Sequence, residues 1–297
     1  MKIFISGSSG FIGNNLSRYL STDKGIKVLI PEGSWKSQYD SRYSINITNW
    51  KEINSYFYRH RVELFINSAI RKGSDFCDLD LKDAYETNII GMMNVIKICN
   101  KYNIPLIHFG TTSYYYSSDS KKIITEDSLR APQNFYALSK LMQEHMIKAY
   151  LKTNYMIIEP VFLYGNLNLY SSGRMESVPD IIVSLLKNEN LLEEVKIDPQ
   201  YIKDYTHIKD FLWIMEKIIY NPIWNRRILV GAGYNHSLLD ILSSEQFSTL
   251  AYRLKFLKEL DYKKNQIHSY DLLNSLYPEW KELNKISLLE YINNLGG

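Results

Sequence analysis

Met1-Lys-Ile-Phe-Ile-Ser-Gly-Ser-Ser-Gly-Phe-Ile-Gly13 is the stretch that decides the fold of this chain. The short apolar run Ile3–Ile5 predicts a strand, and the helical period of the residues after Gly13 predicts a helix. A strand, a glycine turn and a helix in this order are typical of a dinucleotide-binding βαβ unit. In such a turn the first glycine permits the tight bend, the second lets backbone amides approach a pyrophosphate, and the third lets the helix pack closely. We therefore expect a dinucleotide to contact the residues of the turn, Gly7, Gly10, Phe11, Ile12 and Gly13.

Composition limits the class of protein. The 297 residues are 45% hydrophobic and 23% charged, which is ordinary for a globular chain with a substantial core. The formal net charge of +3 is small for this length, so we expect neither nucleic acid nor a membrane surface as a partner. The N-terminus enters a strand at once, no long apolar run occurs, and only two cysteines are present. We expect a cytoplasmic protein without a signal peptide, a transmembrane helix, a disulfide framework or a metal site.

Strands and helices alternate through about residue 165, which predicts an α/β fold with a parallel sheet and helices on both of its faces. The expected strands are 2–6, 26–31, 43–46, 63–68, 104–110 and 154–161, and the expected helices are 12–22, 48–60, 81–102 and 134–152. Beyond residue 165 the pattern predicts helices at 178–186, 204–219, 237–243, 270–276 and 287–294, with one strand at 228–230. We expect a dinucleotide-binding domain, 1–165 plus 200–232, and a smaller, mostly helical C-terminal substrate lobe, 166–199 plus 233–297.

Glu32 follows the second expected strand, 19 residues after Gly13 (32 − 13). In a βαβ unit an acid at this point accepts hydrogen bonds from the adenosine ribose and repels a 2′-phosphate. The alternative is a solvated loop glutamate. Lys36 and Arg42 lie close enough in sequence to approach the same site, so NADP stays possible, but Glu32 favours NAD.

Tyr136 and Lys140 are spaced to share one face of the helix 134–152. An ammonium near a phenol favours the phenolate, which gives a base for a hydroxyl proton. A chance pair is the alternative in a chain with 24 tyrosines, but position argues against it. The strand before this helix runs into Gly110-Thr111-Thr112-Ser113, at the carboxyl end where open α/β sheets bind ligands. We expect Thr112 to share the substrate oxygen with Tyr136, and His108 to lie within the strand rather than in the site.

Six segments of the chain, in order, resemble motifs of the extended short-chain dehydrogenase/reductase family, which contains nucleotide-sugar epimerases, dehydratases and reductases. They are Gly7–Gly13 (G-x-x-G-x-x-G), Glu63–Ala69 (the strand that ends beside the cofactor), Asn88–Gly91 (N-x-x-G), Tyr136–Lys140 (Y-x-x-x-K), Lys203–Asp210 (R-D-Y-I-H-V-x-D) and Gly231–Ser237 (the glycine turn before the C-terminal lobe).

The resemblance implies a Rossmann doubly wound fold with a bound nicotinamide cofactor. It implies that Tyr136 is the catalytic acid/base, that Lys140 binds the nicotinamide ribose, and that Thr112 is the hydroxyl partner. It further places Asn46 and Ile47 near the adenine, Ala69 through Lys72 near the centre of the cofactor, and Asn88 in the cofactor site. Lys203 would face the diphosphate of a nucleotide-sugar substrate.

Several positions depart from the family pattern. Dehydratases carry an Asp-Glu pair directly after the catalytic threonine, whereas this chain has Ser113 and Tyr114. Glu159 stands where arginine is usual, and Phe162 where an asparagine meets the nucleotide sugar. Lys203 replaces an arginine and lacks its bidentate fork. These changes disfavour a 4,6-dehydratase and leave substrate recognition open.

Two functions follow from the resemblance. The first is an NAD-dependent nucleotide-sugar 4-epimerase, in which Tyr136 removes the C4 hydroxyl proton while hydride leaves the same carbon. The second is an NAD(P)H-dependent reductase of a nucleotide-linked 4-keto-deoxysugar. A non-catalytic dinucleotide-binding protein is a third possibility, although both Tyr136 and Lys140 are retained. Helices 81–102 and 134–152 have wide apolar faces, and in this family the matching helices form a dimer interface, so the resemblance implies a homodimer. The alternative is that these faces only cover the sheet.

Overall fold

The computed structural model describes residues 1–8, 10–23, 25–29, 45–71, 74–115, 123–165, 182, 193–195, 201–237, 254–256 and 266–294. Predicted cofactor residues Glu32 and Lys72, together with Lys36 and Arg42, lie outside these ranges. The chain forms two compact units, the first made of 1–114, 131–159 and 218–228, and the second of 115–130, 160–217 and 229–297. The first break therefore falls at residue 114, earlier than the sequence suggests, and residues 200–217 belong to the second unit.

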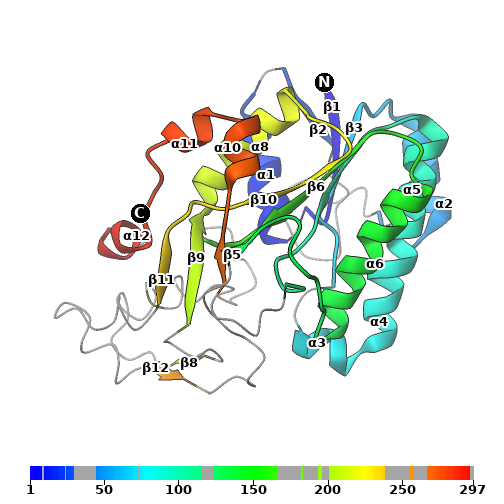
Figure 1. Ribbon diagram of the computed structural model, residues 1–297. Coiled ribbons are helices and arrows are strands. Elements are labelled where there is room, and N and C mark those ends of the chain that lie inside the picture. The colour runs from blue at the N-terminus through cyan, green and yellow to red at the C-terminus, as the bar shows by residue number, and fades with distance from the viewer. Residues whose placement is uncertain are drawn as a thin grey trace. The chain divides into compact units, whose positions relative to one another are not determined.

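A six-stranded sheet of order β10-β6-β4-β3-β1-β2 organises the first unit (Figure 1). Its strands are β1 (Lys2–Ser6), β2 (Lys27–Leu29), β3 (Leu64–Asn67), β4 (Leu106–Phe109), β6 (Tyr155–Pro160) and β10 (Arg226–Val230). The neighbours from β2 through β6 pair in parallel, which confirms the predicted α/β class and Rossmann-type sheet. The strand order changes direction at β1, which pairs with β2 on one side and β3 on the other, and ligands of open sheets bind at such a point. In the expected strand 43–46, residues 45 and 46 are not in a strand, and the rest lies outside the described residues.

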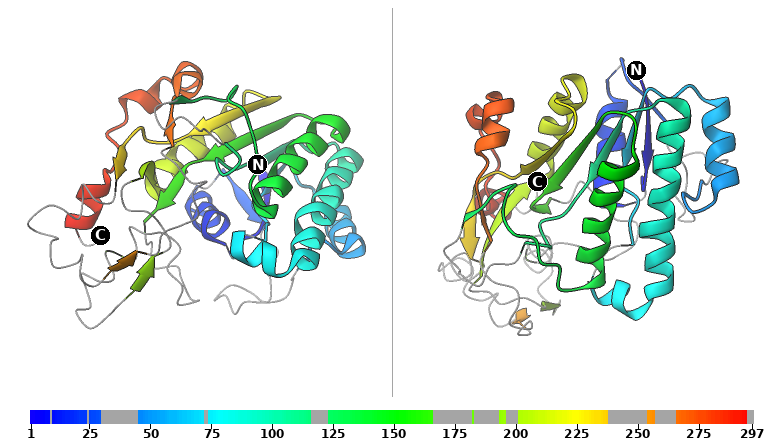
Figure 2. Two further views of the ribbon diagram at one scale, coloured as in Figure 1. Left: turned by 60° about the horizontal axis from the view of Figure 1, so that its bottom comes forward. Right: turned by 45° about the vertical axis from the view of Figure 1, so that its right-hand side comes forward.

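The predicted helices appear as α1 (Phe11–Ser21), α2 (Trp50–Arg59) and α6 (Phe135–Tyr150). The single helix expected over 81–102 is instead α4 (Leu81–Tyr85), a π-helical turn (Glu86–Ile90, labelled η1) and α5 (Gly91–Tyr102). A π turn inserts an extra residue into the helix and is frequent at functional sites. The short helix α3 (Ser74–Leu79) was not predicted. Figure 2 shows α5 and α6 running side by side.

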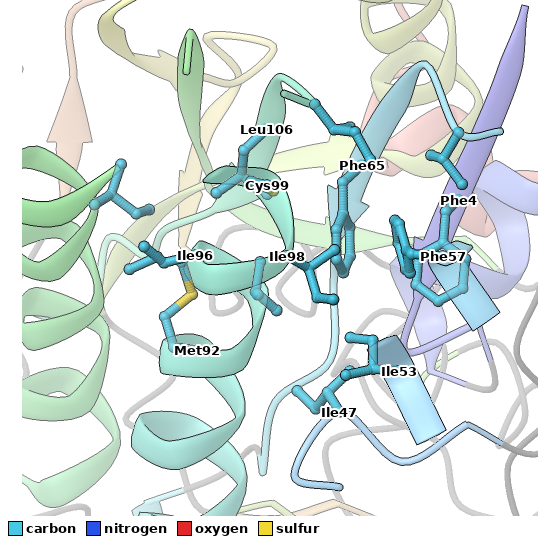
Figure 3. Packing of buried hydrophobic residues seen from close by; sticks show 14 of the residues in the cluster. Phe4, Ile47, Ile53, Phe57, Phe65, Met92, Ile96, Ile98, Cys99 and Leu106 are labelled. Carbon is cyan, nitrogen blue, oxygen red and sulfur yellow. The ribbon is translucent and has the colours of Figure 1, made fainter. Parts of the chain in front are cut away.

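The core of this unit lies between the sheet and helices α2 and α5. Phe4 of β1 packs edge-on against Phe57 of α2 and Phe65 of β3, with ring centroids 4.7 and 4.9 Å apart (Figure 3). Ile53 and Val95 join the same cluster with no exposed surface. Each such side chain contributes roughly 1.5–3 kcal/mol by burial. This packing fixes the strands whose carboxyl ends carry the candidate site.

The second unit contains strands that the sequence did not indicate. One sheet has the order β11-β9-β7 and is formed by β7 (Phe162–Tyr164), β9 (Ile202–His207) and β11 (Asn235–Ser237). Two further sheets have two strands each. One pairs β5 (Ile123–Ile124) with β13 (Ile267–His268), and the other pairs β8 (Glu193–Val195) with β12 (Leu254–Phe256). Its helices are α8 (Ile208–Tyr220), α10 (Asp271–Leu276), α11 (Glu279–Glu282) and α12 (Leu288–Asn293).

One helix boundary in this unit was predicted wrongly. The helix expected over 204–219 begins only at Ile208, because the preceding residues are buried between β7 and β11 as β9. Tertiary pairing here overrides the local helical pattern. The helices expected at 178–186 and 237–243 fall almost entirely outside the described residues. Within the described chain, no helix combines the length and the apolar character needed to cross a bilayer.

Candidate active site

The glycine turn between β1 and α1 fits a pyrophosphate. Gly7 has φ +68°, and a Cβ there would lie 2.6 Å from the Ala69 amide nitrogen. A Cβ on Gly13 would lie 2.3 Å from the Gly7 carbonyl oxygen, so both glycines are required by backbone packing. Gly10 is exposed, and the nearest atom to its Cβ position is the Gly7 oxygen at 3.3 Å. Because no side chain caps α1 at Gly10 and its first turn holds no acid, this positive helix end suits an anionic ligand.

Phe11 and Ile12 begin α1 and are half-buried. Ala69 adjoins Gly7, so the structure brings these predicted cofactor residues together. Ile47, in contrast, packs in the core, and its Cδ1 lies 2.7 Å from the position of a Cβ on Gly91. Asn46 is exposed, and its side-chain oxygen accepts a hydrogen bond of 3.0 Å from the Thr48 amide. Contact of residues 46 and 47 with the adenine stays a prediction.

Asn88 lies in the π turn and is fully buried. Its side chain accepts from the Arg71 amide (2.7 Å) and donates to the Arg71 carbonyl (3.2 Å) and to Ser139 Oγ (3.0 Å). Asn88 therefore clamps the segment after β3 onto α6. Its side-chain amide is engaged in these contacts, and its place in the cofactor site stays a prediction.

Tyr136 and Lys140 occupy one face of α6, as the spacing predicts. The Lys140 side chain is 3% exposed, and its Nζ donates a 2.5 Å hydrogen bond to the Phe109 carbonyl at the end of β4. Burial lowers the pKa of Lys140 to about 7. Burial also raises the pKa of Tyr136, and a hydrogen bond with Thr111 only partly offsets this effect. The sequence leads one to expect a lowered pKa for Tyr136, whereas burial here raises that pKa above the ordinary tyrosine value.

Thr111 and Thr112 are both buried at the carboxyl end of β4. It is Thr111 that hydrogen-bonds the Tyr136 side chain, and its Oγ1 also donates to Ser113 Oγ at 3.0 Å. The sequence indicated Thr112 as the hydroxyl partner. The structure adds Thr111, which the tandem of hydroxyl residues after the strand could have signalled. His108 lies inside β4 and is 1% exposed, where the sequence placed it.

Glu159 is a buried acid directly behind the threonine loop, and sequence reasoning gave it no role. A Cβ on Gly110 would lie 2.9 Å from Glu159 Cγ, and the Tyr114 hydroxyl donates to the Glu159 carboxyl group. Arg227 Nε lies 3.6 Å from Glu159, and Arg227 also lies 3.6 Å from Glu144. Arg227 belongs to β10, the strand next to β6, so this neighbouring strand brings a guanidinium beside the Glu159 carboxyl group. Burial raises the pKa of Glu159 to about 8, although Arg227 acts in the opposite direction.

The raised pKa of Glu159 predicts a pH dependence of stability. The folded chain holds this proton up to about pH 8, whereas the unfolded chain releases it near the ordinary glutamate pKa, so stability is lost as pH rises between these values. The free energy of unfolding should fall by on the order of 1 kcal/mol per pH unit through this group. In urea unfolding at pH 5, 6 and 7, Glu159→Gln should remove this slope, and Glu86→Gln, at an exposed site, should keep it. Parallel slopes in all three proteins would contradict the assignment.

Lys203 lies in β9 of the second unit. It is 4% exposed, and its Nζ sits 4.3 Å from the centre of the Phe162 ring. Two of the residues that depart from the family pattern therefore contact each other, as a cation–π pair. Among the described residues, no three histidine, cysteine, aspartate or glutamate side chains gather to hold a metal ion.

Known proteins share the fold of this chain. Residues 3–230 match the NAD dependent epimerase/dehydratase family. The protein CapI of Staphylococcus aureus is 23% identical over 238 residues, covering 75% of this chain and 70% of CapI. The UDP-glucose 4-epimerase of Thermus thermophilus, solved with NAD, has the same fold, with a TM-score of 0.81, 16% identity, and coverage of 100% of this chain and 99% of that one. A dTDP-4-dehydrorhamnose reductase ortholog from Clostridium acetobutylicum matches with a TM-score of 0.73, 22% identity and 99% coverage of both chains.

Proposed function

Because the chain belongs to the NAD-dependent epimerase/dehydratase family, we propose that it is a nucleotide-sugar 4-epimerase that uses NAD. The observation that carries the proposal is the grouping of Tyr136, Lys140 and the Thr111–Thr112 pair at the carboxyl end of β4. The glycine turn after β1 offers a dinucleotide-binding helix start in the same unit. Proton transfer to and from a substrate oxygen is the chemistry that suits a phenol, an ammonium and hydroxyl groups at the carboxyl end of one strand.

In this mechanism the chain moves one proton. Tyr136 takes the proton of the sugar 4-hydroxyl and returns it to the same oxygen after the sugar has turned over. The threonine hydroxyls hold that oxygen by hydrogen bonds, and Lys140 in its charged form stabilises the phenolate. A bound nicotinamide would supply the acceptor and donor of the hydride at C4. Because burial raises the pKa of Tyr136, the positive charge of a bound oxidised nicotinamide would favour the phenolate that this step needs.

We propose that Lys203 binds the substrate. Its ammonium supplies a positive charge that suits the diphosphate of a nucleotide sugar, and the Phe162 ring holds that ammonium in one place. Glu32 is proposed to select NAD over NADP through the adenosine ribose. We expect no nucleic acid, membrane surface or metal ion to take part in binding the substrate or the cofactor.

The second candidate is an NAD(P)H-dependent reductase of a nucleotide-linked 4-keto-deoxysugar. Phe162 favours it, because an aromatic ring replaces the asparagine that usually meets the sugar in relatives. A 4,6-dehydratase is disfavoured, because Tyr114 is fully buried and bonded to Glu159 where that chemistry needs an acid facing the sugar. A non-catalytic dinucleotide-binding protein would not need the Tyr136 and Lys140 arrangement.

The bound cofactor and its turnover separate these functions. The purified protein is denatured to release any nucleotide, whose identity and redox state are read by mass spectrometry and absorbance. It is then incubated with UDP- and dTDP-hexoses, with and without NADPH. An epimerase interconverts the 4-epimers without consuming reduced cofactor. Stoichiometric oxidation of NADPH with a 4-keto sugar would favour the reductase. No turnover with any of these sugars would favour the non-catalytic dinucleotide-binding protein.

We also propose a homodimer formed by α4, α5 and α6. These helices expose a set of large apolar side chains, Leu81 (54%), Tyr85 (47%), Met93 (41%), Leu138 (42%) and Met142 (36%). Leu138 and Met142 are four residues apart on one face of α6. Exposed apolar side chains gathered on adjacent helices are typical of an interaction surface.

Replacing Leu138 and Met142 together by aspartate should therefore give a monomer in sedimentation velocity at micromolar concentration. Two charges in an apolar interface would lose their water without gaining partners. Leu129→Asp, at a leucine that is 71% exposed and outside these helices, should stay dimeric. A monomeric parent protein, or a double variant that remains dimeric, would contradict the proposed interface.

A further inference from the structure

A row of buried polar side chains crosses the first unit beneath the candidate site. Its members come from three neighbouring strands, from the π turn and from α6, and none is more than 1% exposed: Ser6, Asn67, His108, Gln143, Asn88 and Ser139. Polar groups buried this deeply are costly unless they are hydrogen-bonded. Their arrangement must therefore satisfy donors and acceptors in a definite order.

A backbone carbonyl fixes that order. Gln143 Nε2 donates to the Asn88 carbonyl at 2.6 Å, and because a carbonyl only accepts, the Gln143 side-chain oxygen must face His108. His108 Nε2 lies 3.1 Å from that oxygen and so carries the proton. His108 Nδ1 then accepts from the Asn67 amide at 3.2 Å. The histidine is thus a neutral Nε2–H tautomer.

The two ends of the row reach the two parts of the site. At one end, Ser6 Oγ donates to Asn67 Oδ1 at 2.6 Å, and Ser6 immediately precedes Gly7 of the cofactor turn. At the other end, the Asn88 amide donates to Ser139 Oγ, which donates to the Tyr136 carbonyl at 2.8 Å. A continuous set of hydrogen bonds therefore connects the glycine turn to the helix of the catalytic tyrosine.

We propose that His108 is a positioning residue for the proposed reaction: as a neutral Nε2–H tautomer it holds the glycine turn and α6 at the separation that the chemistry needs. The inference rests on the proposed function, because it states that the row of hydrogen bonds affects the rate of that reaction. A protonated imidazole could not accept from Asn67 and would repel the Lys140 ammonium. In agreement, burial and the charge of Lys140 hold the pKa of His108 well below its usual value.

The kinetic test compares His108→Phe, which removes both ring nitrogens at similar size, with Ile53→Ala. Ile53 is a fully buried core residue of α2 outside the row, so its variant reports the effect of lost stability alone. We expect His108→Phe to lower kcat by about 10²-fold, because small misplacements of reacting groups cost this much, and to change the KM of the sugar less than threefold. Ile53→Ala should lose thermal stability but keep kcat. Equal kcat values in the two variants would overturn the proposal.

An NMR experiment tests the same inference without any measurement of sugar turnover. In protein labelled with ¹⁵N-histidine and loaded with NAD, the resonances lost in His108→Phe should show a protonated Nε2 and an unprotonated Nδ1, unchanged from pH 5.5 to 8.5. A titrating ring or the Nδ1–H tautomer would overturn it. Titration of NAD into each variant should show at least threefold weaker binding by His108→Phe than by Ile53→Ala, and equal binding would count against the row. If the parent protein turns over no sugar, the proposed function fails, and these two measurements still decide whether the row positions the cofactor turn.

Discussion

Tyr136→Phe is expected to lower kcat by about 10³-fold while leaving the affinity for NAD within twofold. The phenol is the only group proposed to take the proton from the sugar hydroxyl, and a positioned acid/base of this kind contributes roughly 10²–10⁴-fold to a rate. Loss of one oxygen leaves the α6 backbone unchanged, because Asn134 still caps the helix by accepting from the Ala137 amide at 2.8 Å. Lys140 also keeps its bond to the Phe109 carbonyl. Binding and chemistry should therefore separate in this variant.

The measurement is single-turnover conversion of the nucleotide sugar identified with the parent protein, together with fluorescence titration of the cofactor. Tyr150→Phe is the matched control, because Tyr150 ends the same helix and is 68% exposed. It should retain parent activity. Full activity in Tyr136→Phe would show that another group carries the proton, and equal losses in both variants would point to a general defect of α6.

Much of the first unit was predictable because its signals are local. The run Ile3–Ile5 and the helical period after Gly13 are signals of neighbouring residues, and the structure confirms a strand and a helix there. The apolar period of 81–102 predicts a helix in the same way, and the structure is helical throughout this range, although it is divided into α4, η1 and α5. The pair Tyr136 and Lys140 was found for the same reason, since a four-residue spacing on a helix is enough to align two side chains.

The features that the sequence did not reveal depend on residues far apart in the chain. β9 is a strand because β7 and β11 pair with it, although its own residues continue into a helical pattern. The raised pKa of Tyr136 comes from burial, and the Lys140 ammonium is held by the Phe109 carbonyl. Neither effect is visible from a spacing of four. Likewise, Glu159 departs from the family pattern, and only the fold shows that Arg227 lies beside it.

Substitutions in the glycine turn are expected to have the second large effect, which is on NAD affinity. Gly10 and Gly13 have different surroundings, so their variants should differ in stability. Gly10→Val should weaken NAD binding by about 100-fold, roughly 2.7 kcal/mol, and leave the chain folded. The backbone of Gly10, at φ −80° and ψ 170°, suits any residue, and its Cβ position lies 3.3 Å from the Gly7 oxygen. A valine there would occupy space where the pyrophosphate approaches the helix start. As a poor N-cap it should cost about 1 kcal/mol of stability.

Gly13→Val should instead lose both stability and cofactor. Its Cβ would lie 2.3 Å from the Gly7 oxygen and 2.5 Å from Ser68 Oγ, so the turn itself must move, at a cost of about 3 kcal/mol. Thermal unfolding without cofactor and NAD titration, done on both variants, test the contrast. If Gly10→Val bound NAD as the parent does, the pyrophosphate would not lie at this turn. If both variants unfolded alike, Gly10 would be a packing glycine, and its exposed position at the start of α1 would no longer be evidence for a ligand.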